Sequence, residues 1–554
     1  MTDQLKIALA QANPTLGDIE GNFALARAFR EEAEALGADI VVYPELFLTG
    51  YPPEDLVTKP AFQRAAWKAM EDLADMTLDG GPAMLMSAPM VEEGKLYNAV
   101  CLLEAGKVSA RRFKNKLPNY GVFDELRIFE AGPLPGPIPF KGVRLGVMIC
   151  EDMWFPEVAE CLAETGAEML IVPNGSPFDH AKSDERLNHA VHRVTETGLP
   201  LVYLNQIGGQ DELVFDGASF VMNADRSLPV QMASWKESLV VTDWRRQADG
   251  SWKCETEELV DPGQPMERIY HAMVLGLKDY VEKNRFPGVV LGLSGGIDSA
   301  LSAAVAVDAL GAERVHCVMM PSKYTSTESL DDAAECARLL GTRLDTISIA
   351  PAVEAFDAML EAPFAGLEPD ITEENIQSRI RGMTLMALSN KLGPMVLTTG
   401  NKSEMSVGYA TLYGDMCGGY SVLKDVYKST CFKLSTWRNT HFSPLFKGPE
   451  GAVMPQNVIT KPPTAELRED QKDEDSLPPY HILDGILYGL VEQEKSFKEL
   501  VEAGFEPATV SRIQNLLYIA EYKRRQSPPG VKISTKNFGR DRRYPITNAF
   551  RDKR

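Results

Sequence analysis

Three polar residues in the first half of the chain stand where predicted β-strands end. Glu45 follows one apolar run, Lys114 lies in a basic run, and Cys150 closes a second apolar run. In layered α/β folds, functional groups gather at the carboxyl ends of strands, because the loops there vary without disturbing the core. A glutamate can take the proton of a thiol, and a lysine can stabilise the thiolate and the oxyanion formed on a carbonyl. Together they suit attack on an amide, which forms a thioester and releases ammonia.

A structural interpretation of the same residues stays open at this point. A cysteine at the end of an apolar strand usually packs in the core. A single glutamate indicates no chemistry, and Lys116 offers the same charge two residues after Lys114. Spacing alone favours this structural interpretation.

A glycine-rich turn in the second half suits an anion. The apolar run 289–293 leads into Ser294–Ser299, which reads Ser-Gly-Gly-Ile-Asp-Ser and precedes a helical pattern. Glycines let backbone N–H groups approach an anion closely, and the helix N-terminus adds a positive dipole. The turn lacks the Gly-Lys-Ser/Thr ending of a Walker A loop. A glycine turn by itself is weak support, since many strand-to-helix turns need glycine.

The elements that must position these residues form two α/β domains. Apolar runs predict strands in the first half at 5–10, 40–43, 83–88, 97–103, 143–149, 168–172, 201–204, 218–221 and 239–242, with a helix over 22–36. Some are joined by helix-length segments and others by hairpin-length turns, which indicates a mixed, layered unit. Polar, turn-rich stretches within 245–265 predict a boundary between domains 1–250 and 265–554.

The second domain has strand–helix–strand order, which predicts parallel pairing with right-handed crossovers. Its expected strands are 288–293, 315–320 and 344–349, with helices from Met266 and Asp298. The charged stretch 466–475 is expected to be a solvated loop. Eleven Lys and Arg between Lys523 and Arg554 make a basic tail, whose apolar residues favour a packed segment over a free one.

Composition excludes several classes of protein. The 554 residues include 57 Lys and Arg against 78 Asp and Glu, a net charge of −21, with 44% hydrophobic and 24% charged residues. This balance is globular, and its negative sign disfavours nucleic acid and anionic membranes as partners. No apolar run approaches the roughly 20 residues of a membrane span. Eight scattered cysteines without a C-x-x-C pair predict no disulfide or zinc framework, and a cytoplasmic location is expected.

Short sequence segments, two of which contain Glu45 and Cys150, resemble the nitrilase-type amidase family. Segments 11–18, 43–46 and 150–154 are similar to the glutaminase domain of glutamine-dependent NAD synthetases. The resemblance implies an α-β-β-α nitrilase-like sandwich. It also implies a catalytic triad of Glu45, Lys114 and Cys150. The glutamine contacts that it implies are Tyr120, Ser176 and Lys182.

The glycine turn resembles the pyrophosphatase loop of ATP-dependent adenylating enzymes, which include NAD, GMP, asparagine and argininosuccinate synthetases. The resemblance implies a Rossmann-like adenine nucleotide α-hydrolase domain. It places ATP on Ser294, Gly295, Gly296, Ile297, Asp298, Ser299 and Thr399. Because ATP carries about four negative charges, magnesium is required, and carboxylate oxygens are its preferred ligands. The resemblance assigns these ligands to Asp298 and Glu404.

Segments further along resemble NAD synthetases in particular. They are 374–382, 396–404, 413–419, 463–467, 471–480 and 523–548. The resemblance places deamido-NAD on Asn375, Glu404, Tyr409, Asp415 and Lys523, and it makes the basic tail face phosphates. Structural interpretations again exist, namely Asn375 as a helix cap and Asp415 as a turn residue.

The sequence therefore predicts an enzyme that hydrolyses glutamine and amidates deamido-NAD through an adenylated intermediate. A sheltered passage for ammonia between the domains and a homo-oligomer are expected, with ATP, Mg²⁺ and small-molecule substrates as ligands. One alternative is an amidotransferase with the same two halves acting on another carboxylate. The other is a nucleotide-binding regulatory protein whose catalytic residues are idle.

Overall fold

The computed structural model of the chain describes residues 3–180, 183–469, 471 and 477–552. The chain divides into two compact units, Met1–Gly263 and Gln264–Arg554. Within the described part of the chain, no helix is both long and apolar enough to cross a membrane.

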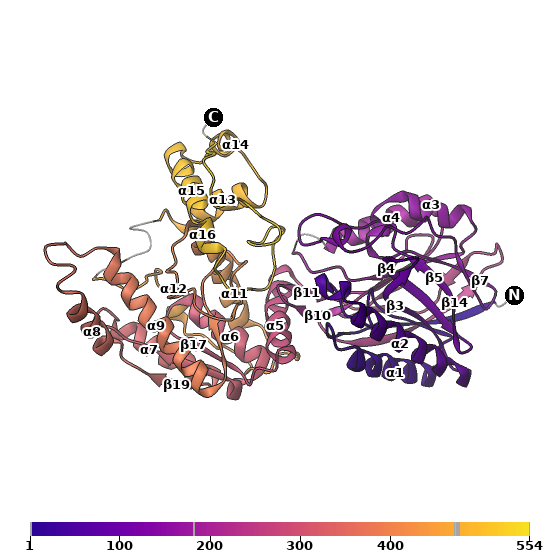
Figure 1. Ribbon diagram of the computed structural model, residues 1–554, viewed down its shortest axis with the longest axis horizontal. Helices are drawn as coiled ribbons and strands as arrows, with labels where there is room; N and C mark the ends of the chain where they lie inside the picture. The colour runs from indigo at the N-terminus through magenta and orange to yellow at the C-terminus, as the bar shows by residue number, and fades with distance from the viewer. Residues whose placement is uncertain (1–2, 181–182, 470, 472–476, 553–554) are drawn as a thin grey trace. The chain divides into compact units, whose positions relative to one another are not determined.

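Two seven-stranded sheets form the centre of the first unit (Figure 1). In spatial order, the first sheet contains β15 (Trp252–Cys254), β14 (Ser238–Arg246), β1 (Gln4–Gln11), β2 (Ile40–Val42), β3 (Ala83–Glu92), β4 (Lys95–Glu104) and β5 (Lys107–Phe113). The second contains β16 (Glu258–Leu259), β13 (Val230–Gln231), β12 (Phe220–Met222), β9 (Leu201–Asn205), β8 (Met169–Asn174), β7 (Val143–Val147) and β6 (Ile138–Phe140). A separate hairpin joins β10 (Ile207–Gln210) to β11 (Leu213–Asp216).

Helices cover the outer faces of both sheets. Residues of α1 (Ile19–Ala35) and α2 (Pro60–Met76) pack on the first sheet, and residues of α3 (Pro156–Glu164) and α4 (Ser183–Thr197) pack on the second. Figure 1 shows the four layers in the order helix, sheet, sheet, helix. This is the α-β-β-α sandwich that the resemblance predicts.

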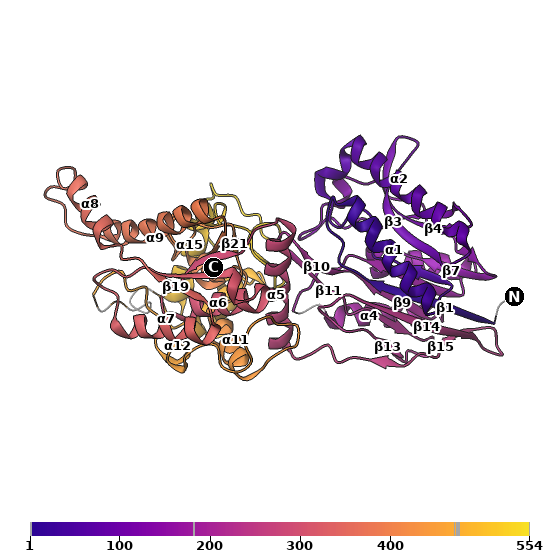
Figure 2. The same cartoon turned by 90° about the horizontal axis from the view of Figure 1, so that it is seen from below.

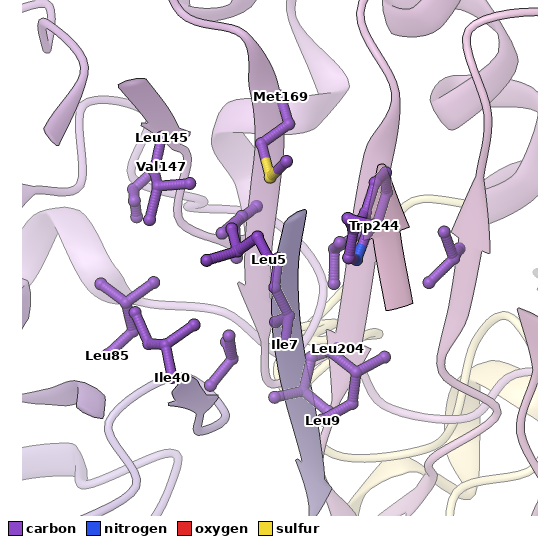
Figure 3. Packing of buried hydrophobic residues seen from close by; sticks show 14 of the residues in the cluster. Leu5, Ile7, Leu9, Ile40, Leu85, Leu145, Val147, Met169, Leu204 and Trp244 are labelled. Carbon is purple, nitrogen blue, oxygen red and sulfur yellow. The ribbon is translucent and has the colours of Figure 1, made fainter. Parts of the chain in front are cut away.

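Alternate side chains of β1 pack into two different apolar cores. Its residues Leu5, Ile7 and Leu9 face the other sheet, whereas Ala8 and Ala10 face α1 and α2. Successive side chains of a strand point to opposite faces, and small alanines let helices approach closely. Figure 3 shows the intersheet core, in which the β1 leucines and isoleucine meet side chains from β7, β8 and β9.

The turn near residue 250 lies inside the first unit. Residues Arg245 and Arg246 belong to β14, which pairs with β15 through Arg246 and Trp252. The turn-rich stretch after Trp244 is therefore a hairpin loop, and the first unit continues through β16 to Gly263. The predicted strand at 218–221 also begins later, at Phe220, because Ala218 takes a left-handed φ of 53°.

A five-stranded sheet forms the centre of the second unit. Its spatial order is β19 (Arg343–Thr346), β18 (Val315–Met319), β17 (Val289–Gly292), β20 (Met395–Thr398) and β21 (Tyr420–Ser421), all parallel. Figure 2 shows α9 (Ile371–Leu392) on one side of this sheet and α6 (Ile297–Leu310) and α7 (Thr327–Leu340) on the other. This is the doubly covered parallel sheet that the strand–helix order predicts.

The second unit contains nine further α-helices among its described residues. They are α5 (Pro265–Lys283), α8 (Ala350–Leu360), α10 (Lys402–Val407), α11 (Lys428–Thr440), α12 (Gln456–Thr460), α13 (Tyr480–Val491), α14 (Phe497–Glu502), α15 (Pro507–Ile519) and α16 (Glu521–Arg524). An apolar cluster holds α13, α14 and α15 together and includes Phe538 of the C-terminal segment. Part of the predicted loop 466–475 lies outside the described residues.

The basic tail is packed, and several of its cations bond to acidic side chains of the same unit. Lys532 pairs with Asp541 at 3.0 Å, and Arg542 pairs with Glu521 at 3.0 Å. These contacts tie parts of the tail to the second unit. Lys523 is the member of the tail that lines the nucleotide-sized cavity described below.

Two candidate active sites

Glu45, Lys114 and Cys150 meet in the first unit. They follow β2, β5 and β7, so both sheets of the sandwich contribute to one site. The Lys114 ammonium donates to Glu45 Oε1 at 2.7 Å, and both side chains are fully buried. The Cys150 thiol belongs to the same cluster, because Glu45 raises its pKa and Lys114 lowers it.

Burial of the Cys150 side chain sets the resting state of the thiol. Burial, reinforced by Glu45, raises the pKa of Cys150 well above its usual range. The thiol is therefore neutral at rest and requires a base before it can attack a carbonyl. Cys150 also has a φ of 47°, a left-handed conformation that is rare outside glycine and that recurs at functional sites.

Two further groups hold the Glu45 carboxylate in place. Asn98 Nδ2 donates to its Oε1 at 2.8 Å, and the backbone N–H of Gly175 donates to its Oε2 at 3.0 Å. Gly175 leads into Ser176, whose N–H bonds Asn205 Oδ1 at 2.9 Å. The carboxylate is thus fixed by its neighbours and keeps one defined orientation toward the site.

Glu125 is a fourth charged member of this cluster, and our sequence analysis missed it. Its Oε1 accepts from Lys114 Nζ at 2.8 Å and from the Tyr51 hydroxyl at 2.8 Å. Burial, together with the nearby Glu45, raises the pKa of Glu125 to about 7, while Lys114 lowers it. Burial lowers the pKa of Lys114, but Glu125 and Glu45 outweigh it and raise that pKa well above its usual range.

Two of the three predicted glutamine contacts, Tyr120 and Ser176, lie among the described residues. Tyr120 is 48% exposed, and its hydroxyl donates to a carboxylate oxygen of Glu151 at 3.0 Å. Glu151 directly follows Cys150 in the chain. Ser176 is buried, and its Oγ accepts from Arg186 Nε at 3.2 Å. Lys182 lies outside the described residues. Glu151, absent from the predicted set, is buried and accepts from the Tyr120 hydroxyl.

A cavity of about 340 Å³ lies in the second unit at the carboxyl ends of the parallel strands. Seven of the predicted nucleotide residues line it, namely Ser294, Ser299, Asn375, Thr399, Tyr409, Asp415 and Lys523. Ser294 follows β17 and Thr399 follows the neighbouring β20. Gly295, Gly296 and Ile297 lie in the same loop and at the first residue of α6.

Hydrogen bonds of its own serine side chains fix the Ser294–Ser299 loop. Ser299 Oγ accepts from the Ser294 N–H at 3.2 Å and donates to the Gly296 carbonyl at 2.9 Å. Gly295 has a φ of 79°, and a Cβ there would meet the Ser329 carbonyl at 2.2 Å. Only glycine fits at this position.

The two predicted metal ligands converge on one cation, the ammonium group of Lys428. Lys428 Nζ bonds Asp298 and also bonds Glu404 Oε1 at 3.2 Å. Asn401 joins the same two residues, because its Nδ2 donates to Asp298 Oδ1 at 3.0 Å and its Oδ1 caps the Glu404 N–H at 3.0 Å. The two carboxylates thus share one cation of the protein, and their assignment as magnesium ligands stays a prediction.

The remaining predicted contacts have defined places in the cavity wall. Asn375 lies inside α9, whose N-cap is Asp370, so it is not a helix cap. Its Oδ1 accepts from Thr411 Oγ1 at 2.8 Å. Burial raises the pKa of Asp415, whose Oδ1 accepts from the Thr411 N–H at 2.6 Å. Lys523 Nζ donates to two backbone carbonyls, and burial lowers its pKa.

Known proteins resemble both units. The carbon-nitrogen hydrolase family model matches residues 6–253, and the NAD synthase model matches residues 269–527. A glutamine-dependent NAD(+) synthetase from Rhodobacter capsulatus is 53% identical over 553 residues, covering 100% of both chains. A second, from Thermotoga maritima, is 41% identical over 99% of each chain.

Two solved structures share the architecture. Glutamine-dependent NAD+ synthetase from Acinetobacter baumannii, in complex with ADP, is 40% identical, with a TM-score of 0.79 over 99% of each chain. Glutamine-dependent NAD(+) synthetase from Cytophaga hutchinsonii, 23% identical, has a TM-score of 0.82 over 99% of this chain and 98% of its own. The second similarity concerns the fold alone.

Proposed function

This chain belongs to the glutamine-dependent NAD(+) synthetases, and from that premise we propose which residues carry each half of the reaction. It is a ligase with a glutaminase domain and an NAD synthase domain. We assign glutamine hydrolysis to the first unit and amidation of deamido-NAD to the second. The observation that carries this assignment is the buried cluster of Cys150 with Glu45 and Lys114.

In the proposed first half-reaction, Glu45 takes the thiol proton of Cys150, and the sulfur forms a bond with the carboxamide carbon of glutamine. The Lys114 ammonium stabilises the oxyanion that develops on the carbonyl oxygen. The C–N bond then breaks, and the proton held by Glu45 passes to the leaving nitrogen, which departs as ammonia. Water hydrolyses the resulting thioester, which yields glutamate and restores the thiol.

The substrate's other polar groups require contacts at the rim of the site. We propose Tyr120, Ser176 and Lys182 for this role, as the family resemblance implies. Glu151 supports the assignment, because its carboxylate beside Tyr120 suits the α-ammonium group of glutamine. The Arg186 guanidinium donates to Ser176 Oγ and pairs with Asp216 at 2.8 Å, which fixes the position of the serine.

In the proposed second half-reaction, the backbone of the Ser294–Ser299 loop and Thr399 bind ATP. The nicotinate carboxylate of deamido-NAD attacks the α-phosphorus, and pyrophosphate leaves. Ammonia then adds to the carboxyl carbon, and AMP departs as the amide of NAD forms. Asn375, Glu404, Tyr409, Asp415 and Lys523 hold deamido-NAD in this proposal.

Asp298 and Glu404 suit magnesium. Their carboxylates already share one cation, Lys428, which supports a second cation at the same place when ATP adds its negative charge. Mg²⁺ is usually bound through one or two protein carboxylates, with substrate phosphates and water completing its shell. The ion would neutralise charge on the phosphates.

We also propose a homo-oligomer and a cytoplasmic location. Four large apolar side chains of α8, α9 and the segment between them are 66–69% exposed, namely Met359, Leu367, Ile371 and Met383. Such an apolar surface suits contact with a second copy. All eight cysteines are free, which suits a reducing compartment.

Exchange of labelled pyrophosphate into ATP tests the substrate of the second half-reaction. The proposal predicts exchange that depends on deamido-NAD. Exchange that depends instead on xanthosine monophosphate or on aspartate would contradict it. The assay needs no glutamine, so it examines the second unit independently of the first.

A further inference from the structure

Arg381 is a charged residue in the wall of the nucleotide cavity to which neither the family resemblance nor the proposed mechanism gives a role. It lies on α9 and lines the cavity together with Ser294, Ser299 and Thr399. Its neighbour Arg379 points elsewhere, because its Nε donates to the Leu412 carbonyl.

The guanidinium of Arg381 is anchored at one point. Its Nε donates to the carbonyl of Met320 at 3.1 Å. Met320 comes directly after β18, which pairs with β17, and β17 leads into the Ser294–Ser299 loop. The anchor therefore places the guanidinium at the same sheet edge as the phosphate-binding loop, one strand away.

Its charge has no close counter-charge in the part of the chain that the structure describes. No carboxylate there lies within ion-pair distance of Arg381, and no further acceptor bonds its two terminal nitrogens. The carboxylate that acts on it from a longer range is Glu466. That carboxylate is already engaged, since Ser326 Oγ and Ser329 Oγ each donate to it at 2.8 Å.

Arg381 is half-buried in the cavity wall, and its two terminal nitrogens carry four N–H donors that an anionic ligand in the cavity could accept from. Burial lowers the pKa of Arg381 to about 10, so the side chain stays charged at neutral pH. Its planar fork matches phosphate oxygens in geometry as well as charge. Both nucleotides that the cavity is proposed to take carry phosphates.

We propose that Arg381 binds a phosphate oxygen of a nucleotide held in this cavity, through its terminal nitrogens, while Nε stays on Met320. The inference rests on the proposed function, because it requires nucleotides in the cavity. Arg381 would then be a further nucleotide-binding residue, and a phosphate of the nucleotide would neutralise its charge.

Isothermal titration of the full chain with ATP alone and with deamido-NAD alone tests this inference. R381M should weaken one of the two affinities by about 10- to 100-fold, the range of a charge-assisted hydrogen bond. R381K, which keeps the charge but not the fork, should lose less. The weakened nucleotide identifies the source of the phosphate.

A matched control is R343M, since Arg343 lies on β19 and pairs with Asp345 at the surface. It should leave both affinities within twofold of the wild type. If R381M and R381K, both folded, also stay within twofold for both nucleotides, the inference is overturned. The result is independent of catalysis, because a wild-type chain that binds nucleotides without forming NAD would contradict the proposed function and leave the Arg381 contact measurable.

Discussion

The ammonium group of Lys114 lies 2.8 Å from a carboxylate oxygen of Glu125, and both side chains are buried. Lys114 thus has two carboxylate partners, of which Glu45 is also the proposed base. A buried lysine between two carboxylates is held in one orientation. Glu125 is therefore a positioning residue for the ammonium that is proposed to stabilise the oxyanion.

Replacement of Glu125 tests this role. E125Q should lower kcat for glutamine hydrolysis by on the order of 100-fold, because Lys114 loses one of its two anchors. NAD formation driven by ammonium salt should not change. The control is E130Q, since Glu130 is exposed and its closest cation lies at 3.9 Å. A glutaminase rate within twofold of the wild type in folded E125Q would contradict this role.

Loss of the Asp298 carboxylate should impair the second half-reaction and leave glutamine hydrolysis intact. D298N should reduce deamido-NAD-dependent pyrophosphate exchange by at least about 100-fold, because it removes one of the two proposed magnesium ligands. Glutamine hydrolysis measured without ATP should continue. The matched control D331N changes an exposed aspartate of α7. Unimpaired exchange in D298N would remove Asp298 from the proposed magnesium site.

Lys402 joins the C-terminal segment to α10, which carries Glu404. It is fully buried, pairs with Asp425 at 2.7 Å, and donates to Ser534 Oγ at 2.6 Å. K402M should destabilise the protein by about 3–5 kcal/mol, because it leaves buried carboxylates without their cation. Calorimetry should show a lower first unfolding transition in K402M.

The control for this change is K68M. Lys68 forms an exposed pair with Asp72 on α2, and such pairs contribute roughly 0–1 kcal/mol. A first transition in K402M no lower than that of K68M would mean that the buried pairing adds no stability.

His271 in α5 predicts a pH dependence of stability. Burial lowers its pKa to about 4, from 6.5 in the unfolded chain. Below pH 6.5 the unfolded chain binds a proton that the folded chain excludes, so stability falls as the pH drops from 6.5 toward 4. H271Q should therefore lose about 2 kcal/mol less than the wild type between pH 7 and pH 5.

Urea unfolding of both proteins at the two pH values measures this difference. H441Q, at an exposed histidine, serves as the control and should behave like the wild type. Equal pH dependence in H271Q and the wild type would show that His271 is not excluded from protonation in the fold.

The sequence predicts the residues that follow strands better than those that come from elsewhere. Glu45 and Cys150 stand at the ends of apolar runs, and Lys114 follows β5. Neighbouring or facing strands bring such ends together. Glu125 reaches Lys114 through the fold of a loop that has no periodic pattern, so no spacing rule indicates it. Lys428 reaches Asp298 from the start of α11 in the same way.

Long-range pairing also explains what happens to the basic tail. The apolar residues of the tail predict a packed segment, and Lys532 and Arg542 indeed bond Asp541 and Glu521 within the second unit. The role of the tail toward phosphates, which the resemblance implies, stays a prediction. A count of charges cannot reveal partners that folding supplies. The same holds for the turn-rich stretch 245–250. It is polar like a linker, yet Arg245 and Arg246 belong to β14 and the rest is the loop that joins β14 to β15.

In the proposed reaction, one unit makes ammonia at Cys150 and the other uses it. C150A tests this most directly, with NAD formation measured in parallel from glutamine and from ammonium chloride. We predict that glutamine-driven synthesis falls by more than about 1,000-fold, while ammonium-driven synthesis stays within twofold of the wild type. Glutamine-driven synthesis that survives, or ammonium-driven synthesis that fails in the folded variant, would contradict the account.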